Sequence, residues 1–166
     1  LKEAYGETVS EAETLRARMY AKKEEIVQKD GLPQIPGVKE AIKRFHDEGF
    51  RLEVASSSAG YYIGRVLDAL EIRQYFECYT SGEEVDHPKP APDTVVRAME
   101  KLKLKPEDCL IVEDSTNGGK AAAAAGTKGV WLHTPDSGDQ QIPHAALELA
   151  SWSQDNVEKI IELMKQ

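Results

Sequence analysis

The sequence has little of the material that would define a secreted, membrane or nucleic-acid-binding protein. It has two cysteines among 166 residues, Cys78 and Cys109. These are too few for a disulfide framework, so we expect reduced thiols in a reducing compartment. No apolar stretch approaches the roughly 20 residues that span a membrane, and Leu1–Gly6 lacks the pattern of a signal peptide. These absences predict a cytoplasmic protein with no membrane partner.

An excess of positive charge is also missing. The net charge is −8 and the pI is about 5.1, whereas nucleic acid and anionic membranes are bound by basic surfaces. Hydrophobic residues make up 40% of the chain and charged residues 30%, as in an ordinary globular protein with a real core. We therefore expect a globular protein that does not bind nucleic acid but could still bind phosphate at a site with its own cations and amides.

Two parts of unequal length can be distinguished along the chain. Residues 10–29 have the pattern of one helix, because the Ser10/Glu13 pair fits a capping box and charged residues crowd most of its faces. The turn-rich segment Asp30–Gly37 ends that helix. We therefore divide the chain into residues 1–34 and residues 35–166.

Helical spacing and short apolar runs alternate from residue 38 to the end. This alternation predicts βαβ units, and thus an α/β fold with a mainly parallel sheet and helices on both faces. Right-handed crossovers place the carboxyl ends of such strands on one edge of the sheet. The expected helices are 38–48, 62–70, 91–102, 116–125 and 156–165, and the expected strands are 50–55, 75–79, 109–112, 129–132 and 146–149.

An acidic pair ends the apolar run in Leu110–Gly119. Glu113 and Asp114 follow directly on an expected buried strand, and Ser, Asn and two Gly come next. Ligand sites of open α/β sheets lie at the carboxyl ends of strands, and adjacent carboxylates suit Mg²⁺, which takes one or two protein oxygens plus a substrate phosphate. The alternative is structural: Asp114 or Ser115 could cap the Ala-rich helix that follows.

A hydroxyl-rich loop follows another expected strand. In Val54–Gly60, three serines stand between the strand and the next helix. A hydroxyl and free backbone amides in this position can hold phosphoryl oxygens. We assign the side-chain contact to Ser56 and a backbone N–H contact to Ser57. The alternative is that these serines only cap the helix.

One lysine stands on a stiff loop. Lys89 lies between two prolines in Asp86–Asp93, and proline restricts both its own φ and the residue before it. An ammonium aimed in this way can neutralise charge on a transferring phosphoryl group. The alternative is an ordinary solvated lysine.

With these motifs the chain resembles the haloacid dehalogenase-like phosphohydrolases, in the branch with an α-helical cap that includes β-phosphoglucomutase-like proteins. The resemblance implies that Ser56 is the hydroxyl of the second family motif, Lys89 the lysine of the third, and Glu113 and Asp114 the acidic pair that binds Mg²⁺. It also implies a Rossmann-like core, with residues 1–34 as the last part of the helical cap.

The first motif of that family, Asp-x-Asp-Gly-Thr, is absent from the sequence. In the family its leading Asp is the nucleophile, on a central strand between the strands that carry the Ser motif and the acidic motif. A sheet without its middle strand leaves backbone groups unpaired. We therefore expect the chain to be a fragment whose missing segment precedes Leu1, was cleaved, or comes from another chain. Such a fragment should not run the covalent reaction alone.

The resemblance implies a Mg²⁺-dependent phosphatase that acts on a small phosphorylated metabolite, such as a sugar phosphate. One alternative is a phosphosugar mutase. Some mutases of the family have Lys and Asn just after the Ser motif, where this chain has Ala59 and Gly60, so the departure weighs against mutase activity. The other alternative is a non-catalytic phosphate-binding protein that has lost the first motif.

Overall fold

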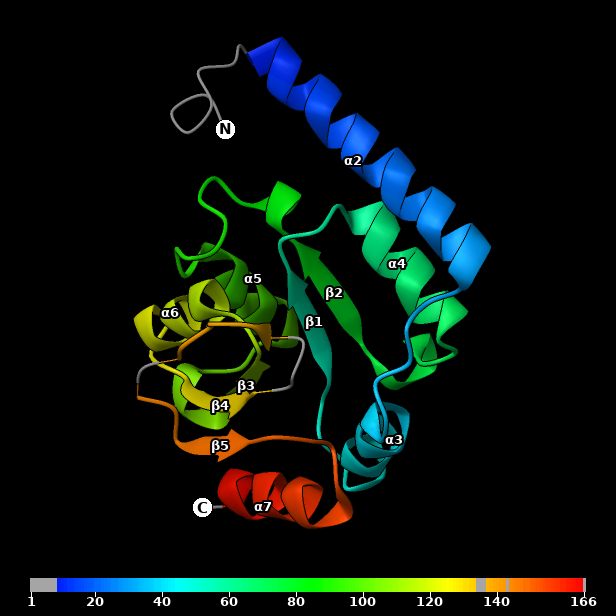
Figure 1. The fold of residues 1–166 in the computed structure, drawn as a ribbon. Helices are drawn as coiled ribbons and strands as arrows, with labels where there is room; N and C mark the ends of the chain where they lie inside the picture. The colour runs from blue at the N-terminus through cyan, green and yellow to red at the C-terminus, as the bar shows by residue number, and fades with distance from the viewer. Residues whose placement is uncertain (1–8, 134–136, 143, 166) are drawn as a thin grey trace. The chain divides into compact units, whose positions relative to one another are not determined.

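The computed structural model describes residues 9–133, 137–142 and 144–165 (Figure 1). The predictions on Leu1–Gly6 lie outside these residues. The chain divides into two compact units, Leu1–Gln34 and Ile35–Gln166. The boundary lies within the turn-rich segment that follows the first helix.

The described part of the first unit consists of one long helix, α2 (Val9–Asp30), and the residues after it. The helix begins one residue before Ser10, the predicted cap. It ends at Asp30 and is followed by Gly31, whose φ of +77° is a backbone conformation that favours glycine. Leu15, Met19 and Ile26 are exposed large apolar side chains on this helix.

The second unit alternates helices and strands, as the sequence predicts. Its helices are α3 (Val38–Asp47), α4 (Gly60–Ala69), α5 (Asp93–Leu102), α6 (Thr116–Ala124) and α7 (Gln154–Met164). Its strands are β1 (Glu53–Ser56), β2 (Cys78–Ser81), β3 (Leu110–Glu113), β4 (Lys128–Leu132) and β5 (Leu147–Leu149). Three short 3₁₀ turns connect them: η1 (Arg73–Tyr75), η2 (Gly82–Glu84) and η3 (Pro106–Asp108).

Two strands begin three residues later than predicted, for local reasons. The strand predicted from Phe50 begins at Glu53, because the Phe50 N–H closes the end of α3 by donating to Phe45 O at 3.1 Å. The strand predicted from Tyr75 begins at Cys78, because Arg73–Tyr75 forms a 3₁₀ turn. Apolar periodicity marked both segments correctly but did not separate the strand from the turn before it.

The described strands form two sheets, and every pairing is parallel. One sheet contains β1 and β2, and the other has the order β3–β4–β5. Glu53 lies opposite Cys78 in the first, and Val112 lies opposite Val130 in the second. Parallel strands joined by helices agree with the predicted fold class, but β1 and β3 do not pair with each other among the described residues.

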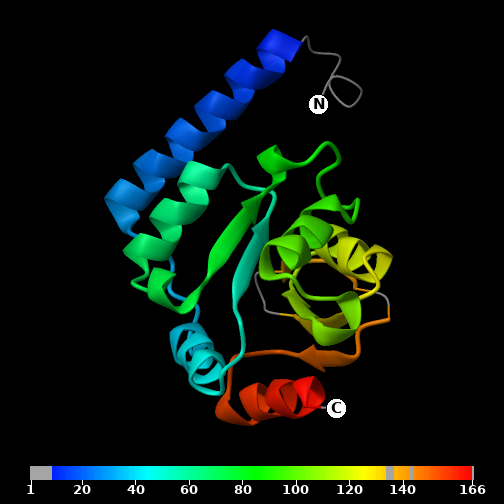
Figure 2. The same ribbon diagram turned by 180° about the vertical axis from the view of Figure 1, so that it is seen from behind.

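Helices cover both faces of these strands. Helices α5 and α6 lie on one side of the β3–β4–β5 sheet, and α3 and α7 lie on the other (Figures 1 and 2). The main apolar core lies on the α3/α7 side. Its buried members are Ala41, Phe45, Val130, Leu132, Leu149, Val157, Ile160 and Ile161.

Helices on both faces connect the two sheets. Helix α5 packs against β1 and β2, and through Val95 and Met99 it also contacts Ile111 of β3. On the other face, the α3/α7 core includes Leu52, just before β1, and Val112 of β3. Both faces of the space between β1 and β3 are therefore covered by helices.

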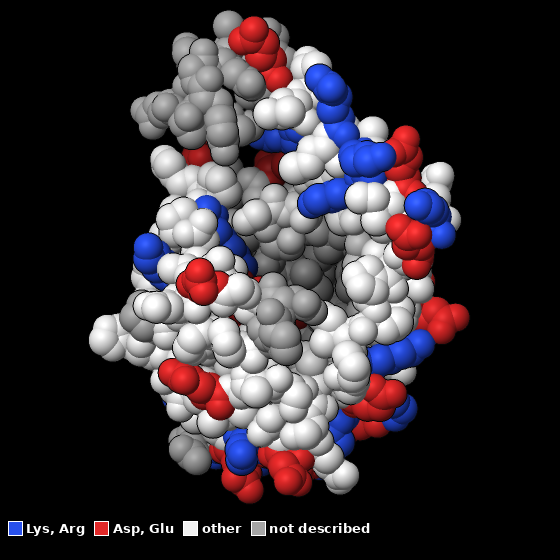
Figure 3. Space-filling model, viewed as in Figure 1, with Lys and Arg blue, Asp and Glu red and all other residues white. Residues whose placement is uncertain are grey.

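The first turn of α3 is fixed by a close approach of the backbone. Gly37 precedes α3 with a φ of +80°, and a Cβ at this position would lie 2.4 Å from Trp152 O. Glycine therefore lets the start of α3 contact the loop before α7. Basic and acidic side chains lie next to one another at the bottom of Figure 3. On α3, Arg44 pairs with Glu48 of the same helix end and with Glu158 of α7. No helix in the described part of the chain is long and apolar enough to cross a membrane.

Candidate phosphate and metal site

The structure brings the five candidate residues to one cavity at the carboxyl ends of β1 and β3. Ser56 and Ser57 come from the end of β1, Glu113 and Asp114 from the end of β3, and Lys89 from the loop before α5. The cavity is further lined by Ile35, Val38, Val54, Ala55, Val112, Ser115, Leu132 and Trp152. The hydroxyl, the ammonium and the acidic pair therefore face a shared space, although they are spread over 59 positions of the sequence (from 56 to 114).

The serine loop is held by the loop that follows β2. Ser56 Oγ accepts a hydrogen bond from the Ser58 N–H at 3.1 Å. The buried Ser81 Oγ donates to Ser58 O at 2.7 Å, and Glu83 Oε2 accepts from the Gly60 N–H at 3.2 Å. The loop is thus fastened at its middle and its end, which fixes the direction in which its amides and hydroxyls point.

Lys89 connects the two sheets. Its Nζ donates to Ala55 O of β1 at 3.0 Å and forms an ion pair with Glu113 of β3. The two side chains are 8% and 13% exposed, so both charges are largely withdrawn from water. The Lys89–Pro90 peptide bond is cis. Through these contacts Lys89 points to the carboxyl ends of both strands. It is not an ordinary solvated lysine, because its side chain is only 8% exposed.

Glu113 is held from a second direction by the start of α6. Its Oε2 accepts a hydrogen bond from Ser115 Oγ at 3.1 Å, and Ser115 Oγ accepts from the Gly118 N–H at 3.0 Å as the helix cap. A Cβ on Gly118 would lie 1.9 Å from Glu113 Cδ. The absence of a side chain at Gly118 therefore makes room for the carboxylate.

Asp114 differs from its neighbour because it is exposed. No hydrogen bond or ion pair of its side chain is found among the described residues, whereas Glu113 is engaged by Lys89 and Ser115. In the same part of the chain, no three His, Cys, Asp or Glu side chains gather as a ready metal site. A single free carboxylate still fits Mg²⁺, which commonly takes one or two protein carboxylates and completes its shell with water and substrate phosphate. Of the predicted acidic pair, Asp114 is the side chain free to bind a cation.

The sequence analysis missed the residues that support the site. Ser115 was considered only as a cap, yet it both caps α6 and donates to Glu113. Ser81 and Glu84 form a capping box at η2, and this pattern is visible in the sequence as Ser-x-x-Glu. Its further contact with Ser58 depends on tertiary structure and carries no local signal.

The chain thus has parallel α/β strands with a hydroxyl loop, a lysine and an acidic pair at their carboxyl ends, and this arrangement defines its structural class. The comparison with protein families specifies this class further. Residues 1–132 match the family model of the haloacid dehalogenase-like hydrolases, so the chain belongs to this family.

The chain is similar in sequence to named phosphatases and similar in fold to solved structures of the family. It is 29% identical over 123 residues to hexitol phosphatase B of Escherichia coli K12, covering 74% of this chain and 55% of that protein. CbbY of Rhodobacter sphaeroides, solved in complex with phosphate, is 27% identical with a TM-score of 0.67, covering 72% of this chain and 55% of that one. The fold also matches a putative β-phosphoglucomutase of Thermotoga maritima, with a TM-score of 0.76 at 23% identity over 91% of this chain and 69% of that one. The chain spans about half the length of curated relatives such as hexitol phosphatase B.

Proposed function

We propose that the protein to which this chain belongs is a Mg²⁺-dependent phosphatase of small phosphorylated metabolites, such as a sugar phosphate. The observation that carries the proposal is the cavity that gathers Ser56, Ser57, Lys89 and the acidic pair. Membership in the hydrolase family and the resemblance to hexitol phosphatase B support it.

Each group has a distinct part in the proposed reaction. Ser56 Oγ and the Ser57 N–H hold phosphoryl oxygens, as a hydroxyl and an amide at a strand end can do. The Lys89 ammonium offsets negative charge on the phosphoryl group where it develops. Glu113 keeps Lys89 in place, because its carboxylate is held by Ser115 on the other side.

Asp114 would hold the Mg²⁺, and the ion would supply positive charge next to the phosphoryl oxygens. Among the described residues lining the cavity, every carboxylate except Asp114 is engaged by another side chain. The nucleophile of the proposed reaction is an aspartate that these 166 residues do not supply in an Asp-x-Asp-Gly-Thr turn. We therefore expect this chain by itself to bind phosphate or Mg²⁺ weakly and not to turn over substrate.

The test is phosphate release from a panel of sugar and polyol phosphates by the intact protein, with and without Mg²⁺. We expect activity that requires Mg²⁺ and falls at least 100-fold in Asp114→Asn. The matched control is Asp47→Asn at the end of α3, which pairs with Lys43 and does not line the cavity, and it should keep full activity. Activity that survives Asp114→Asn or Mg²⁺ removal would contradict the assignment.

The phosphosugar mutase is the less supported alternative. Ala59 and Gly60 offer no side-chain group to hold a second phosphate, and Gly60 is already engaged through its N–H with Glu83. Conversion of a sugar monophosphate to its isomer, faster than phosphate release, would favour the mutase. Phosphate binding without either reaction in the intact protein would favour the non-catalytic alternative.

A further inference from the structure

The segment that follows β4 is fastened to the first turn of α6. We call its described residues 137–142 the strap. The Thr116 N–H donates to Gln140 Oε1 at 2.8 Å, and in return the Gln141 N–H donates to Thr116 Oγ1 at 2.9 Å. One residue of α6 therefore holds the strap through both its backbone and its side chain.

An apolar contact also joins the strap to this helix. Ile142 is 6% exposed, and a Cβ on Gly119 would lie 2.4 Å from Ile142 Cγ2. The neighbouring Gly118 makes room for Glu113 instead. The first turn of α6 thus contacts the acidic loop at one glycine and the strap at the other.

Asp114 lies between two residues whose positions are fixed. Glu113 before it is held by Lys89 and Ser115, and Thr116 after it is held by the strap. The Asp114 side chain has no hydrogen bond or ion pair of its own among the described residues. The direction of its carboxylate therefore depends on the backbone on both sides, and the strap fixes one of these sides.

The helix after the serine loop begins in the same way as the helix after the acidic loop. The first amides of a helix have no acceptor within it. Gly60 is the first residue of α4, and its N–H donates to Glu83 from the loop after β2. Thr116 is the first residue of α6, and its N–H donates to Gln140 from the loop after β4. At each of the two loops, a side chain that follows the next strand thus binds the amide that opens the helix.

We propose that Gln140 is a positioning residue of the candidate metal site. By accepting from the Thr116 N–H, it fixes the end of the acidic loop and with it the direction of the Asp114 carboxylate. Gln140 itself touches neither metal nor substrate, and the inference rests on the proposed function, in which Asp114 holds Mg²⁺. A carboxylate already held in its binding direction loses less freedom when the metal binds, so the contact should raise metal affinity.

The first test measures metal binding by the intact protein without substrate. The probe is Mn²⁺, which suits the same oxygen ligands as Mg²⁺, and the readout is the EPR signal of free Mn²⁺. Gln140→Leu removes the acceptor and should raise the dissociation constant about tenfold or more, as for other residues that orient a metal ligand. Gln140→Glu keeps an acceptor for the Thr116 N–H and should bind Mn²⁺ at least as tightly as the unchanged protein. Gln140→Asn is one methylene shorter, so it should lose the contact without placing an apolar side chain in the strap.

The second test separates metal binding from the reaction itself. In the phosphate-release assay, the Mg²⁺ concentration for half-maximal activity should rise in Gln140→Leu by the same factor as the Mn²⁺ dissociation constant. At saturating Mg²⁺, kcat should stay within about threefold of the unchanged protein, because Gln140 does not contact the reacting groups. A general loss of structure would lower kcat at every Mg²⁺ concentration.

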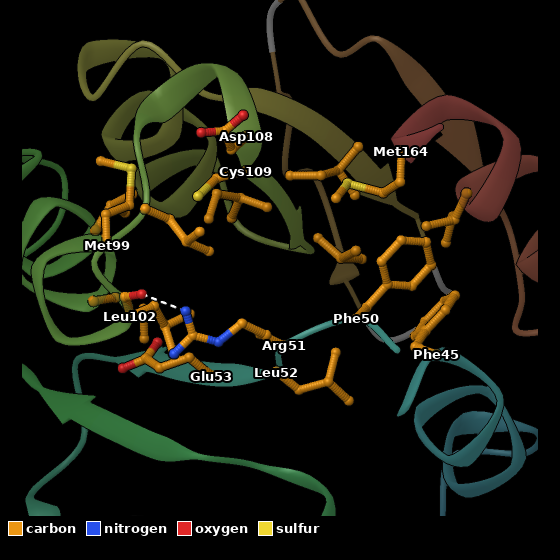
Figure 4. Close-up of a pocket in the computed structure, with 18 of the residues that line it drawn as sticks. Phe45, Phe50, Arg51, Leu52, Glu53, Met99, Leu102, Asp108, Cys109 and Met164 are labelled. Atoms are coloured by element: carbon orange, nitrogen blue, oxygen red, sulfur yellow. Dashed lines mark hydrogen bonds between the residues drawn. The ribbon is translucent and has the colours of Figure 1, made fainter. Parts of the chain in front are cut away.

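Two control variants test whether the effect is specific to Gln140. The Gln141 side chain is exposed, and only its N–H contacts Thr116, so Gln141→Leu should leave Mn²⁺ binding unchanged. Figure 4 shows Arg51, just before β1, donating to Leu102 O at the end of α5, at 2.5 Å. Arg51→Met loses this bond and should lower the melting temperature, but Arg51 does not line the cavity, so Mn²⁺ affinity should stay within twofold.

The outcomes distinguish this inference from the proposed function. Weaker Mn²⁺ binding in both Asp114→Asn and Gln140→Leu, without phosphate release by the unchanged protein, would support the positioning role and count against the phosphatase. Mg²⁺-dependent phosphate release with unchanged Mn²⁺ affinity in Gln140→Leu would overturn the positioning role and leave the phosphatase in place. An equal loss of Mn²⁺ affinity in Arg51→Met, or in Gln140→Glu, would also overturn it.

Discussion

The two sides of the β3 strand differ in how completely the sheet is built. On the β4 side, Val112 lies opposite Val130 and the pairing continues to β5. Beneath it lies a core in which Val130, Leu149 and Ile160 are no more than 5% exposed. On the side that faces β1, the same strand has no partner among the described residues and its side chains are only partly buried.

Among the described residues, the strands are paired on their outer sides, while β1 and β3 do not pair with each other. Both outer parts have their own helices and cores, and each carries one part of the candidate site. The serine loop belongs to the β1–β2 sheet, and the acidic loop belongs to the β3–β4–β5 sheet. The site can be complete only when the two sheets are held together.

The largest expected effect concerns the ion pair that links the two sheets. Lys89→Met leaves the Glu113 carboxylate without its cation at 13% exposure, which should cost about 3 kcal/mol of unfolding free energy, as for other buried pairs that lose one partner. The double variant Lys89→Met/Glu113→Gln should cost clearly less than the sum of the single variants. Urea denaturation of all four proteins measures this coupling.

A surface ion pair supplies the control for that cycle. Lys43 and Asp47 are 57% and 50% exposed, and Lys43→Met should change stability little because water already screens the pair. Additive effects of the Lys89 and Glu113 substitutions would show that this pair does not hold the sheets together.

The second effect compares two valines that are paired in register. Val130→Ala should cost about 2 kcal/mol, because two buried methyl groups are lost and a cavity remains. Val112→Ala, at the open edge, should cost less than half as much. Equal costs in the isolated chain would contradict the picture of an open edge.

The third effect concerns the acidic loop. Ser115→Ala removes the cap of α6 and one of the bonds to Glu113, and it should cost about 1 kcal/mol. Ser153→Ala removes the cap of α7 at a similar cost, and Ser153 does not line the cavity. In the intact protein, only Ser115→Ala should also lower kcat for phosphate release. Equal kcat values in the two variants would show that the hydroxyl of Ser115 does not contribute to the activity of the site.

The smallest effect is a pH dependence of stability at Glu53 of β1. Burial raises the pKa of Glu53, although Thr80 Oγ1 donates to its carboxylate at 2.6 Å. The folded state therefore favours the protonated acid, so this residue opposes folding only as the pH rises above its usual pKa. Glu53→Gln should raise the melting temperature slightly at pH 7.5, with the gain vanishing near pH 4. In Glu71, Lys39 lowers the pKa, so Glu71→Gln should show no gain at pH 7.5.

Much of the fold could be predicted because it depends on local patterns of apolar and polar residues. Apolar spacing located the helices and strands of the second unit, and the succession of strand and helix indicated parallel pairing. The exact starts of β1 and β2 could not be found in this way. Whether Phe50 belongs to a strand or to the end of α3 depends on which backbone group its N–H reaches, and periodicity does not contain that information.

The candidate site could likewise be predicted only in part. The hydroxyl, the lysine and the acids stand out in the sequence because their types and their positions after strands are unusual. The different states of Glu113 and Asp114 could not be predicted, because they depend on Lys89 reaching across from another loop. The need for glycine at position 118 could not be predicted either, because it depends on the Glu113 carboxylate that lies against this position.

The contact of one ammonium with both Ala55 O and Glu113 has a mechanical consequence. Any spreading of β1 from β3 must pull Lys89 away from one of its two partners. The positive charge next to a bound anion would then change with the distance between β1 and β3. Sheet closure and anion affinity should thus rise and fall together, so a ligand that binds at this edge would also clamp the two sheets.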